Sequence, residues 1–498
     1  PGVYNFANSL NPVVASNFNA DMRVLSAYYS ADFTLKDYVT LSTTGRMDKL
    51  STLPAGNNTF FYPSVALSTV LSDYLHMPQA ISFLKLRASY ANVKDGLTQS
   101  TIGVPSWSLG YGQQYASSYD GPTYQNSAVY TTPYTVNNTS TAYFTNALNN
   151  PNIKPNSTSQ TEVGLDARFL NNRLAFDAAY YISNDGPRIF NLPISETTGY
   201  SSALVNGITT QKKGIELSLT GKVLRLSNGF NWDVLANWST YKEVYTDFYP
   251  GVTALNTFFR IGDRTDKYYT STFVRSPDGQ IINDAGGRPL RTPVAQYVGN
   301  INPDWVWGLN NRFSYKDFTF SFQFDGRVGG VISDYIQQKS YAGGRIINTV
   351  QGDMGIARLN DTKGIKSYVG EGVQVSNGAQ INYDADGYVT NHAELQFTPN
   401  TTKAFLQDYI ARRYGFDGGN IISRSFAKLR EVVVGYTLPQ KAISRLGIRQ
   451  ASISFVGRNL LYFAERTDID IDQFTSGGRS DLQTPTTRRY GFNLNLTF

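Results

Sequence analysis

Hydrophobic and polar side chains alternate strictly at the end of the chain. One face of residues 489–498 carries Tyr490, Phe492, Leu494, Leu496 and Phe498, and the other carries Arg489, Gly491, Asn493, Asn495 and Thr497. A period of two is the repeat of a β-strand with one apolar and one polar face. Such a strand is typical of a barrel wall between lipid and water, because only helices and closed barrels satisfy every backbone group in hydrocarbon. The alternative is the edge strand of a soluble sandwich.

The same alternation recurs along the chain and favours the barrel. It predicts about 13 antiparallel strands, with clear pairs at 162–169 and 174–182, and at 305–315 and 318–327. In the last of these, Phe318, Phe320, Phe322 and Phe324 alternate with Thr319, Ser321, Gln323 and Asp325. Four Phe at a period of two cannot share one face of a helix. The sequence therefore predicts an all-β fold, a transmembrane antiparallel barrel formed by residues 1–498.

The connections between these strands alternate between short and long. Short connections fall near residues 36, 75, 171, 227, 316 and 442. Long loops are predicted at about 94–159, 183–212, 243–302, 329–423 and 460–487, with a possible short helix at 402–414. Bacterial barrels have short periplasmic turns and long extracellular loops. Because an odd number of strands does not close such a barrel, we expect further residues or another chain to supply its start.

Composition narrows the function further. Charged residues make up 16% of the 498 residues and aromatic residues 14%, with 34 Tyr and 29 Phe, and Tyr suits the boundary between lipid and water. No run of 18 apolar residues predicts a transmembrane helix. The chain has no Cys, which excludes disulfides and thiolate metal sites. The net charge is +6, but Lys and Arg are dispersed, so we predict no nucleic-acid partner.

Several sequence stretches, in order, resemble one family. They are Lys213-Gly-Ile-Glu-Leu217, Tyr297-Val-Gly-Asn-Ile-Asn-Pro-Asp304, Phe426-Ala-Lys-Leu-Arg-Glu-Val-Val-Val-Gly-Tyr-Thr-Leu-Pro439, Ala451-Ser-Ile-Ser-Phe-Val-Gly-Arg-Asn-Leu460 and Tyr490-Gly-Phe-Asn-Leu-Asn-Leu-Thr-Phe498. Together they are similar to the C-terminal part of the SusC-like (RagA-type) TonB-dependent transporters of the bacterial outer membrane. The resemblance covers most predicted strands and little of the long loops.

The resemblance implies the C-terminal portion of a barrel of roughly 22 strands. It also implies a plug domain and TonB contact through an N-terminal region missing from this chain, and a SusD-like surface lipoprotein that covers the barrel. The implied activity is the import of oligomeric nutrients, glycan or peptide, across the outer-membrane lipid, with no cofactor and no enzymatic reaction. Two alternatives stay open: a passive porin, and a non-transporting surface scaffold or adhesin.

Candidate ligand-binding residues lie in the predicted outer loops and lumen. Aromatic side chains could stack on sugar rings or peptide side chains, while Arg and Asn supply hydrogen bonds; the alternative is that they pack on neighbouring loops. The candidates are Trp107, Tyr111, Tyr115, Arg327, Arg458 and Asn459. Residues predicted to anchor the barrel in lipid, with the terminal Phe as insertion signal, are Phe320, Phe322, Tyr490, Phe492 and Phe498.

Metal and catalytic chemistry have little support. Asn382, Asp384 and Asp386 copy the start of a calcium loop, but Ala393 stands where the bidentate Glu belongs, and the pattern is common in β-turns. We predict no metal site from it. The sequence places no pair of carboxylates across a cleft, so no catalytic residue is predicted.

Overall fold

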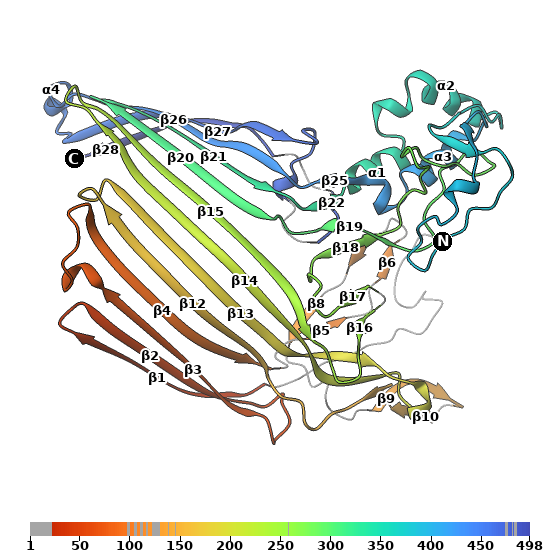
Figure 1. Cartoon of the computed structure of the whole chain (residues 1–498), viewed down its shortest axis with the longest axis horizontal. Coiled ribbons are helices and arrows are strands. Elements are labelled where there is room, and N and C mark those ends of the chain that lie inside the picture. Colours follow the sequence, from red (N-terminus) through yellow and green to blue (C-terminus); the bar gives the residue numbers. More distant parts are fainter. Residues whose placement is uncertain are drawn as a thin grey trace, which may run out of the picture.

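One large antiparallel sheet forms most of the molecule (Figure 1). The computed structural model describes residues 22–96, 100–103, 107–109, 113–115, 118–121, 130–137, 139–144, 146–256, 258–473, 477–480, 482 and 486–498. Thirteen strands follow one another across the sheet in chain order, and β1 and β28 form its two ends. The predicted number of strands and the antiparallel wall are confirmed.

The wall strands are between 9 and 24 residues long. They are β1 (Val24–Leu35), β2 (Val39–Leu50), β3 (Thr59–Val70), β4 (Ile81–Asp95), β12 (Asn156–Phe169), β13 (Leu174–Pro193), β14 (Ser202–Arg225), β15 (Phe230–Asp247), β20 (Trp305–Tyr315), β21 (Phe318–Val328), β26 (Phe426–Thr437), β27 (Gln450–Ala464) and β28 (Arg489–Thr497).

The register places apolar side chains on one face of this wall. Phe322 lies opposite Asn311 on one side and Val432 on the other, and Phe320 lies opposite Phe313 and Val434. Aromatic rings form a continuous belt on this face, with neighbouring centroids 5.7–6.2 Å apart, that runs through Trp232, Phe313, Phe320, Phe322 and Phe324. The opposite face carries Ser321, Gln323 and Asp325. Apolar and polar residues of β21 thus lie on opposite faces, as the alternation in the sequence predicts.

Short and long connections lie at opposite ends of the wall (Figure 1). The six short connections share one end with the C-terminus, and the last of them contains α4 (Gln440–Ile443). The other end carries the long connections and α1, α2 and α3. We call it the outer end.

The predicted loop at 183–212 is wrong. β13 continues to Pro193 and β14 already begins at Ser202, so that only 194–201 separate the paired strands. The period of two breaks at Gly186, which has a φ of +130° beside an irregularity in the pairing. Pairing nevertheless resumes, because the extension is packed: Leu204 joins a buried cluster with Leu50, Leu53, Phe60 and Ile153.

The outer end also carries a small mixed region between β21 and β26. Its helices are α1 (Tyr335–Ala342), α2 (Gly352–Asp361) and α3 (Leu406–Arg413), the last inside the predicted 402–414 helix. Asp361 at the end of α2 accepts hydrogen bonds from the backbone N–H groups of Leu406 and Gln407 and so caps α3. The helices share a buried cluster of Tyr341, Ala357, Leu406 and Ile410.

Short strand pairs complete the outer end. They are β5 (Ser100–Gly103) with β8 (Ser118–Gly121), β6 (Trp107–Leu109) with β7 (Gln113–Tyr115), β9 (Tyr130–Val136) with β10 (Thr139–Phe144), β16 (Ala254–Leu255) with β17 (Phe259–Arg260), β18 (Lys267–Thr270) with β19 (Gln296–Asn300), β22 (Val331–Ser333) with β25 (Ile421–Ser423), and β23 (Val373–Val375) with β24 (Phe397–Pro399). β11 (Ala147–Leu148) pairs with β14. Within the described ranges, no helix has both the length and the apolar character needed to cross a membrane.

Candidate functional site

A cavity of about 570 Å³ opens on the polar face of the wall, and we call it the wall hollow. Two rows of cross-strand neighbours line it. The inner row runs through Asp177, Ser218, Asn237, Gly308 and Asp325. The row nearer the outer end runs through Glu216, Ser239, Val306, Arg327 and Phe426.

Gly308 opens the middle of this surface. It lies between Asn237 of β15 and Asp325 of β21 in the register, and a Cβ built on it would meet no heavy atom within 4 Å. The missing side chain therefore leaves space rather than permitting a close approach. A larger residue at this position would fill the wall hollow without a clash against the wall itself.

Some charged side chains around the wall hollow have ion-pair partners and others do not. Arg87 holds Asp177 with Nη1 and Oδ2 2.7 Å apart, and Arg430 Nε lies 2.5 Å from Asp325 Oδ1. By contrast, Glu216 and the Nε of Arg327 have no ion-pair or hydrogen-bond partner among the described residues, although Arg327 stacks on Phe426 with its guanidinium carbon 5.4 Å from the ring centre. The wall hollow thus presents the carboxylate of Glu216 and the guanidinium of Arg327, neither with an ion-pair partner among the described residues, although the Nε of Arg327 itself is covered.

The connection between β27 and β28 folds onto the polar face beside the wall hollow. Lys428 Nζ lies 2.6 Å from Asp470 Oδ2, and Arg430 Nη1 lies 2.6 Å from Asp472 Oδ2. Arg430 therefore joins the wall residue Asp325 to this connection. The apolar side chains beside the two acids enter a buried cluster of Ile332, Ile422, Ile469 and Ile471.

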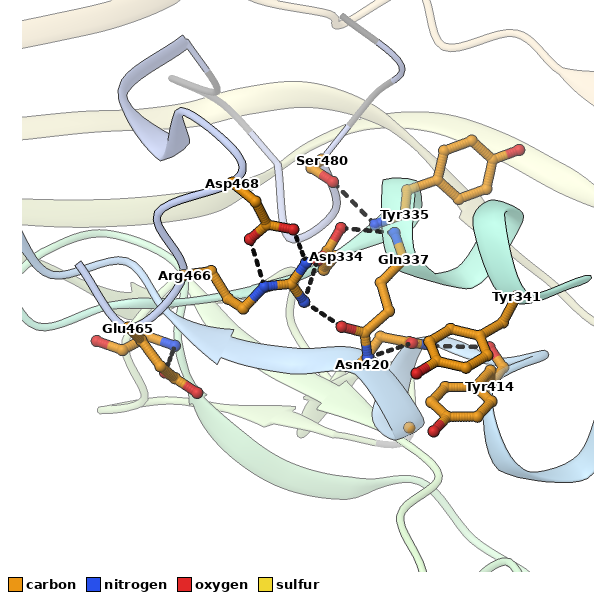
Figure 2. A network of polar contacts seen from close by, with 12 residues as sticks. Asp334, Tyr335, Gln337, Tyr341, Tyr414, Asn420, Glu465, Arg466, Asp468 and Ser480 are labelled. Carbon is orange, nitrogen blue, oxygen red and sulfur yellow. Dashed lines mark hydrogen bonds and ion pairs between the residues drawn. The ribbon is translucent and has the colours of Figure 1, made fainter. Parts of the chain in front are cut away.

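A polar network fastens the helices of the outer end to the same connection (Figure 2). Arg466 Nη1 lies 3.0 Å from Asp334 Oδ2, and its Nη2 lies 2.5 Å from Asp468 Oδ2. The guanidinium also donates a hydrogen bond to Gln337, whose Nε2 is 3.4 Å from Asn420 Oδ1. One cation thus joins α1, the segment before β25 and the β27–β28 connection.

Asp334 has a second role in this network as the cap of α1. Its Oδ1 accepts a hydrogen bond from the backbone N–H of Gln337 at 2.9 Å, and the N–H of Tyr335 donates to Ser480 Oγ at 2.8 Å. These bonds satisfy donors at the start of α1 that have no partner within the helix. At the other side of the network, the rings of Tyr341 and Tyr414 stack 3.6 Å apart with an angle of 6° between their planes.

The two carboxylates around Arg466 differ in their pKa shifts. Burial raises the pKa of Asp334, against the lowering effect of its hydrogen bond from Gln337 and of the Arg466 charge. The hydrogen bond from Arg466 lowers the pKa of the more exposed Asp468. Arg466 therefore pairs with one carboxyl group whose pKa is raised, that of Asp334, and with one whose pKa is lowered, that of Asp468.

The predicted ligand-binding residues are only partly brought together. Arg327 lines the wall hollow, whereas Arg458 pairs with Glu431 further along the wall, with Nε and Oε2 2.8 Å apart. Asn459 lines a separate cavity of about 130 Å³ and donates to the carbonyl of Thr487.

The aromatic candidates lie in the predicted loop at 94–159, which contributes no described residue to the wall hollow. Trp107 and Tyr115 are opposite each other in the register of β6 and β7. Tyr111 falls outside the described residues.

The residues predicted to anchor the barrel lie on the apolar face. Phe320 and Phe322 belong to the aromatic belt, and Tyr490 and Phe492 lie in β28 beside Phe455, with ring centroids 6.2 and 5.5 Å from it. Phe498 is exposed at the end of the chain. Their role in the membrane stays a prediction.

The weak calcium candidate forms a tight turn. Oδ1 of Asp384 accepts hydrogen bonds from the backbone N–H groups of Asp386 and Tyr388, and Gly387 has a φ of +79°. Asn382 closes the turn by accepting a hydrogen bond from Thr390 N through its carbonyl oxygen. In the described part of the chain, no group of three or more His, Cys, Asp and Glu side chains is placed to hold a metal ion.

Sequence patterns did not identify several residues of the wall hollow. Glu216, Gly308 and Asp325 sit on predicted strands, but their proximity depends on cross-strand register, which alternation within one strand does not determine. Asp472 comes from a predicted loop. A hairpin-by-hairpin register from the short turns could have brought Gly308 and Asp325 together, since only the turn at 316–317 separates their strands.

Comparison with known proteins gives relatives across nearly the whole chain. The TonB-dependent receptor P3 of Formosa agariphila is 22% identical, with 97% of this chain and 46% of the relative covered. SusC of Bacteroides thetaiotaomicron is 22% identical, with 64% of this chain and 33% of the relative covered. The chain thus spans about half of P3 and a third of SusC.

Solved structures show the same fold. The structure of the RagAB peptide transporter matches with a TM-score of 0.66 at 17% identity, over 96% of this chain and 48% of that chain. The RagAB peptide importer in its 'closed-closed' state matches with a TM-score of 0.63 at 18% identity, over 95% of this chain and 48% of that chain.

The family assignment rests on the sequence itself. The family described as TonB dependent receptor-like, beta-barrel, matches residues 2–270, just over half of the chain. Its members are outer-membrane receptors and transporters and not enzymes. The apolar face of the wall is accordingly its lipid face, the polar face borders the lumen, and the chain belongs to the TonB-dependent receptor β-barrel family of the bacterial outer membrane.

Proposed function

We propose that this chain forms the C-terminal part of the barrel of an energised importer of oligomeric nutrients, oligosaccharides or peptides. A SusD-like surface lipoprotein captures the nutrient with it, and TonB drives release through an N-terminal plug that precedes these residues in the complete protein. The relatives that carry the names SusC and RagAB peptide transporter support this assignment.

The observation that carries the proposal is the wall hollow beneath the outer end. Its lining is polar and includes Glu216 and Arg327, two side chains of opposite charge on the lumen face of the wall. Of the two, Glu216 is exposed, whereas the Nε of Arg327 is buried without a partner, which costs free energy. Oligosaccharides and peptides both offer donors and acceptors at close spacing, which is the chemistry that such a lining binds.

The attachment of the outer end to the wall supports energised rather than passive passage. Arg430 and Arg466 connect the wall, the β27–β28 connection and α1 through ion pairs, one of which involves the fully buried Asp334. A region held in this way over the rim restricts free diffusion through the lumen. Import then requires capture at the outer end before release to the periplasm.

The experiment uses cells that carry the complete transporter and its partner lipoprotein. Labelled oligopeptide and oligosaccharide mixtures are supplied separately, with and without an uncoupler of the proton gradient, and in a strain lacking the lipoprotein. We expect uptake of one class, lost with the uncoupler and sharply reduced without the lipoprotein. Uptake that survives the uncoupler together with a steady open conductance would show a porin, and surface binding without uptake would show a scaffold or adhesin.

A further inference from the structure

Two lysines face each other on the lipid face of the wall near its outer end. Lys213 of β14 and Lys242 of β15 are direct cross-strand neighbours, and both are exposed. Like charges in directly opposed positions destabilise a sheet. Neither ammonium has an ion-pair or hydrogen-bond partner among the described residues.

The next lysine in the chain, Lys212, has an acidic neighbour, but on the other face of the wall. Lys212 lies on the lumen face, where its Nζ is 3.8 Å from Glu243 and 5.2 Å from the ring centre of Tyr241. On the lipid face, the next row outward from Lys213 and Lys242 holds the uncharged Gln211, Val244 and Asn184. The opposed pair is therefore a concentration of positive charge that no nearby side chain of the wall offsets.

The pair stands at a sharp boundary in the lipid face. Inward from it, the lipid-facing positions of three adjacent strands are mostly apolar; those next to the boundary are Tyr180 in β13, Ile215 in β14 and Thr240 in β15, and Ile182 lies level with the pair. Outward from it, the positions on β13 and β14 turn polar. Such a change at one level across neighbouring strands marks the boundary between the hydrocarbon and the head groups of the outer leaflet.

A groove runs from the lysines into this apolar surface. It has a volume of about 400 Å³, and its lining includes Tyr180, Lys213, Ile215, Thr240 and Lys242. The small Thr240 lies opposite the larger Ile215 in the register and leaves room beside it. The lining continues one row outward to Gln211 and Val244, so the two lysines lie within the groove and its apolar part lies inward of them.

We propose that this groove is a specific site for a phosphorylated glycolipid of the outer leaflet. Lys213 and Lys242 bind the phosphate of the head group, and an acyl chain fills the groove below them against Tyr180 and Ile215. An anionic head group between the two ammonium groups removes their mutual repulsion, and lysines at a membrane surface bind anionic lipids by this attraction. The site is separate from the wall hollow, because it lies on the opposite face of the sheet.

The test uses the complete transporter, purified in a nonionic detergent and stripped of bound lipid. The probe is monophosphorylated lipid A, compared with the same lipid lacking its phosphate, and bound lipid is counted by native mass spectrometry. The variant K213Q/K242Q removes both charges. Its matched control is K363Q/K403Q, which removes two exposed lysines of the mixed outer region.

We expect the wild type and the control to bind the phosphorylated lipid equally, and K213Q/K242Q to bind it about tenfold more weakly or worse. The phosphate-free lipid should bind the wild type as weakly as the phosphorylated lipid binds the variant. K213R/K242R should restore binding, which separates loss of charge from loss of fold. Equal binding by K213Q/K242Q, equal binding of the phosphate-free lipid, or complete displacement by inorganic phosphate would overturn the proposal.

Discussion

Arg466 and Asp334 form an ion pair, Nη1 to Oδ2 at 3.0 Å, in which the carboxylate is fully buried. Asp334 caps α1, whereas Arg466 lies near the start of the connection that follows β27. The pair therefore joins the start of α1 to the β27–β28 connection (Figure 2).

Replacing Arg466 by Ala should destabilise α1 by about 3 kcal/mol, because it leaves a buried carboxylate without its cation. Hydrogen exchange of the α1 amides in the purified transporter measures the free energy of local opening. The control is Arg458→Ala, which breaks the exposed pair with Glu431 and should cost less than about 1 kcal/mol. Equal effects of the two variants would contradict the role of Arg466.

The stability of α1 should depend on pH through both Asp334 and Asp468, in opposite directions. Because the pKa of Asp334 is raised in the folded state, its contribution to stability is fully present below the unfolded pKa and is lost as pH rises through the folded pKa. Because the pKa of Asp468 is lowered, its contribution is present above the unfolded pKa and is lost as pH falls through the folded pKa.

Asp334→Asn and Asp468→Asn separate these contributions. Asn retains the capping oxygen at position 334. The opening free energy of α1 in Asp334→Asn, relative to the wild type, should increase as pH rises from about 4. The same difference for Asp468→Asn should increase as pH falls below about 4. Hydrogen exchange corrected for the intrinsic rate at each pH measures both slopes, and slopes of the same sign would refute the assignment.

The two faces of β21 should be distinguishable by chemical labelling. The chain has no Cys, so single cysteines introduced into it are labelled without competition from its own residues. Cysteines at Phe320 and Phe322 should react with a lipid-soluble maleimide, and cysteines at Ser321 and Gln323 with a membrane-impermeant one, because successive residues of a strand face opposite sides. The reversed pattern would show that the assigned faces are exchanged.

The terminal residue should matter for insertion more than for stability. A charge at the rim of a barrel costs about 1 kcal/mol or less at equilibrium. If Phe498 is the insertion signal, Phe498→Lys should nevertheless lower the amount of folded protein in the outer membrane several-fold, measured as the heat-modifiable band. Thr497→Lys, one position away on the lumen face, is the control and should leave that amount unchanged.

Sequence patterns predicted the wall well because each strand contains its own signal. Alternation in residues such as Phe318 to Phe324 reports directly on the two solvents that a strand separates. The extension of β13 and β14 was missed because its outer part lies above the lipid, where both faces meet protein or water. There Leu204 packs sideways into a cluster with Leu50 and Ile153, which are distant in sequence.

The candidate site was predictable only in part for the same reason. Arg327 was identified as a polar residue at a strand end, but the wall hollow exists because Gly308 falls between Asn237 and Asp325 in the register. The ion pairs of Arg430 and Arg466 link residues from separate connections. Neither the cross-strand position of Gly308 nor these ion pairs produce a periodic pattern in the sequence.

Uptake by transporters altered at Gly308 tests nutrient passage through the wall hollow most directly. Gly308→Gln places a side chain in the wall hollow, where a Cβ meets nothing within 4 Å, so the barrel should still fold. Gly491→Gln is the matched control, because Gly491 lies on the same face in β28, also has open space around it, and does not line the wall hollow. We predict that Gly308→Gln reduces energised uptake at least tenfold at equal outer-membrane levels while Gly491→Gln does not; equal uptake by both variants would contradict nutrient passage through the wall hollow.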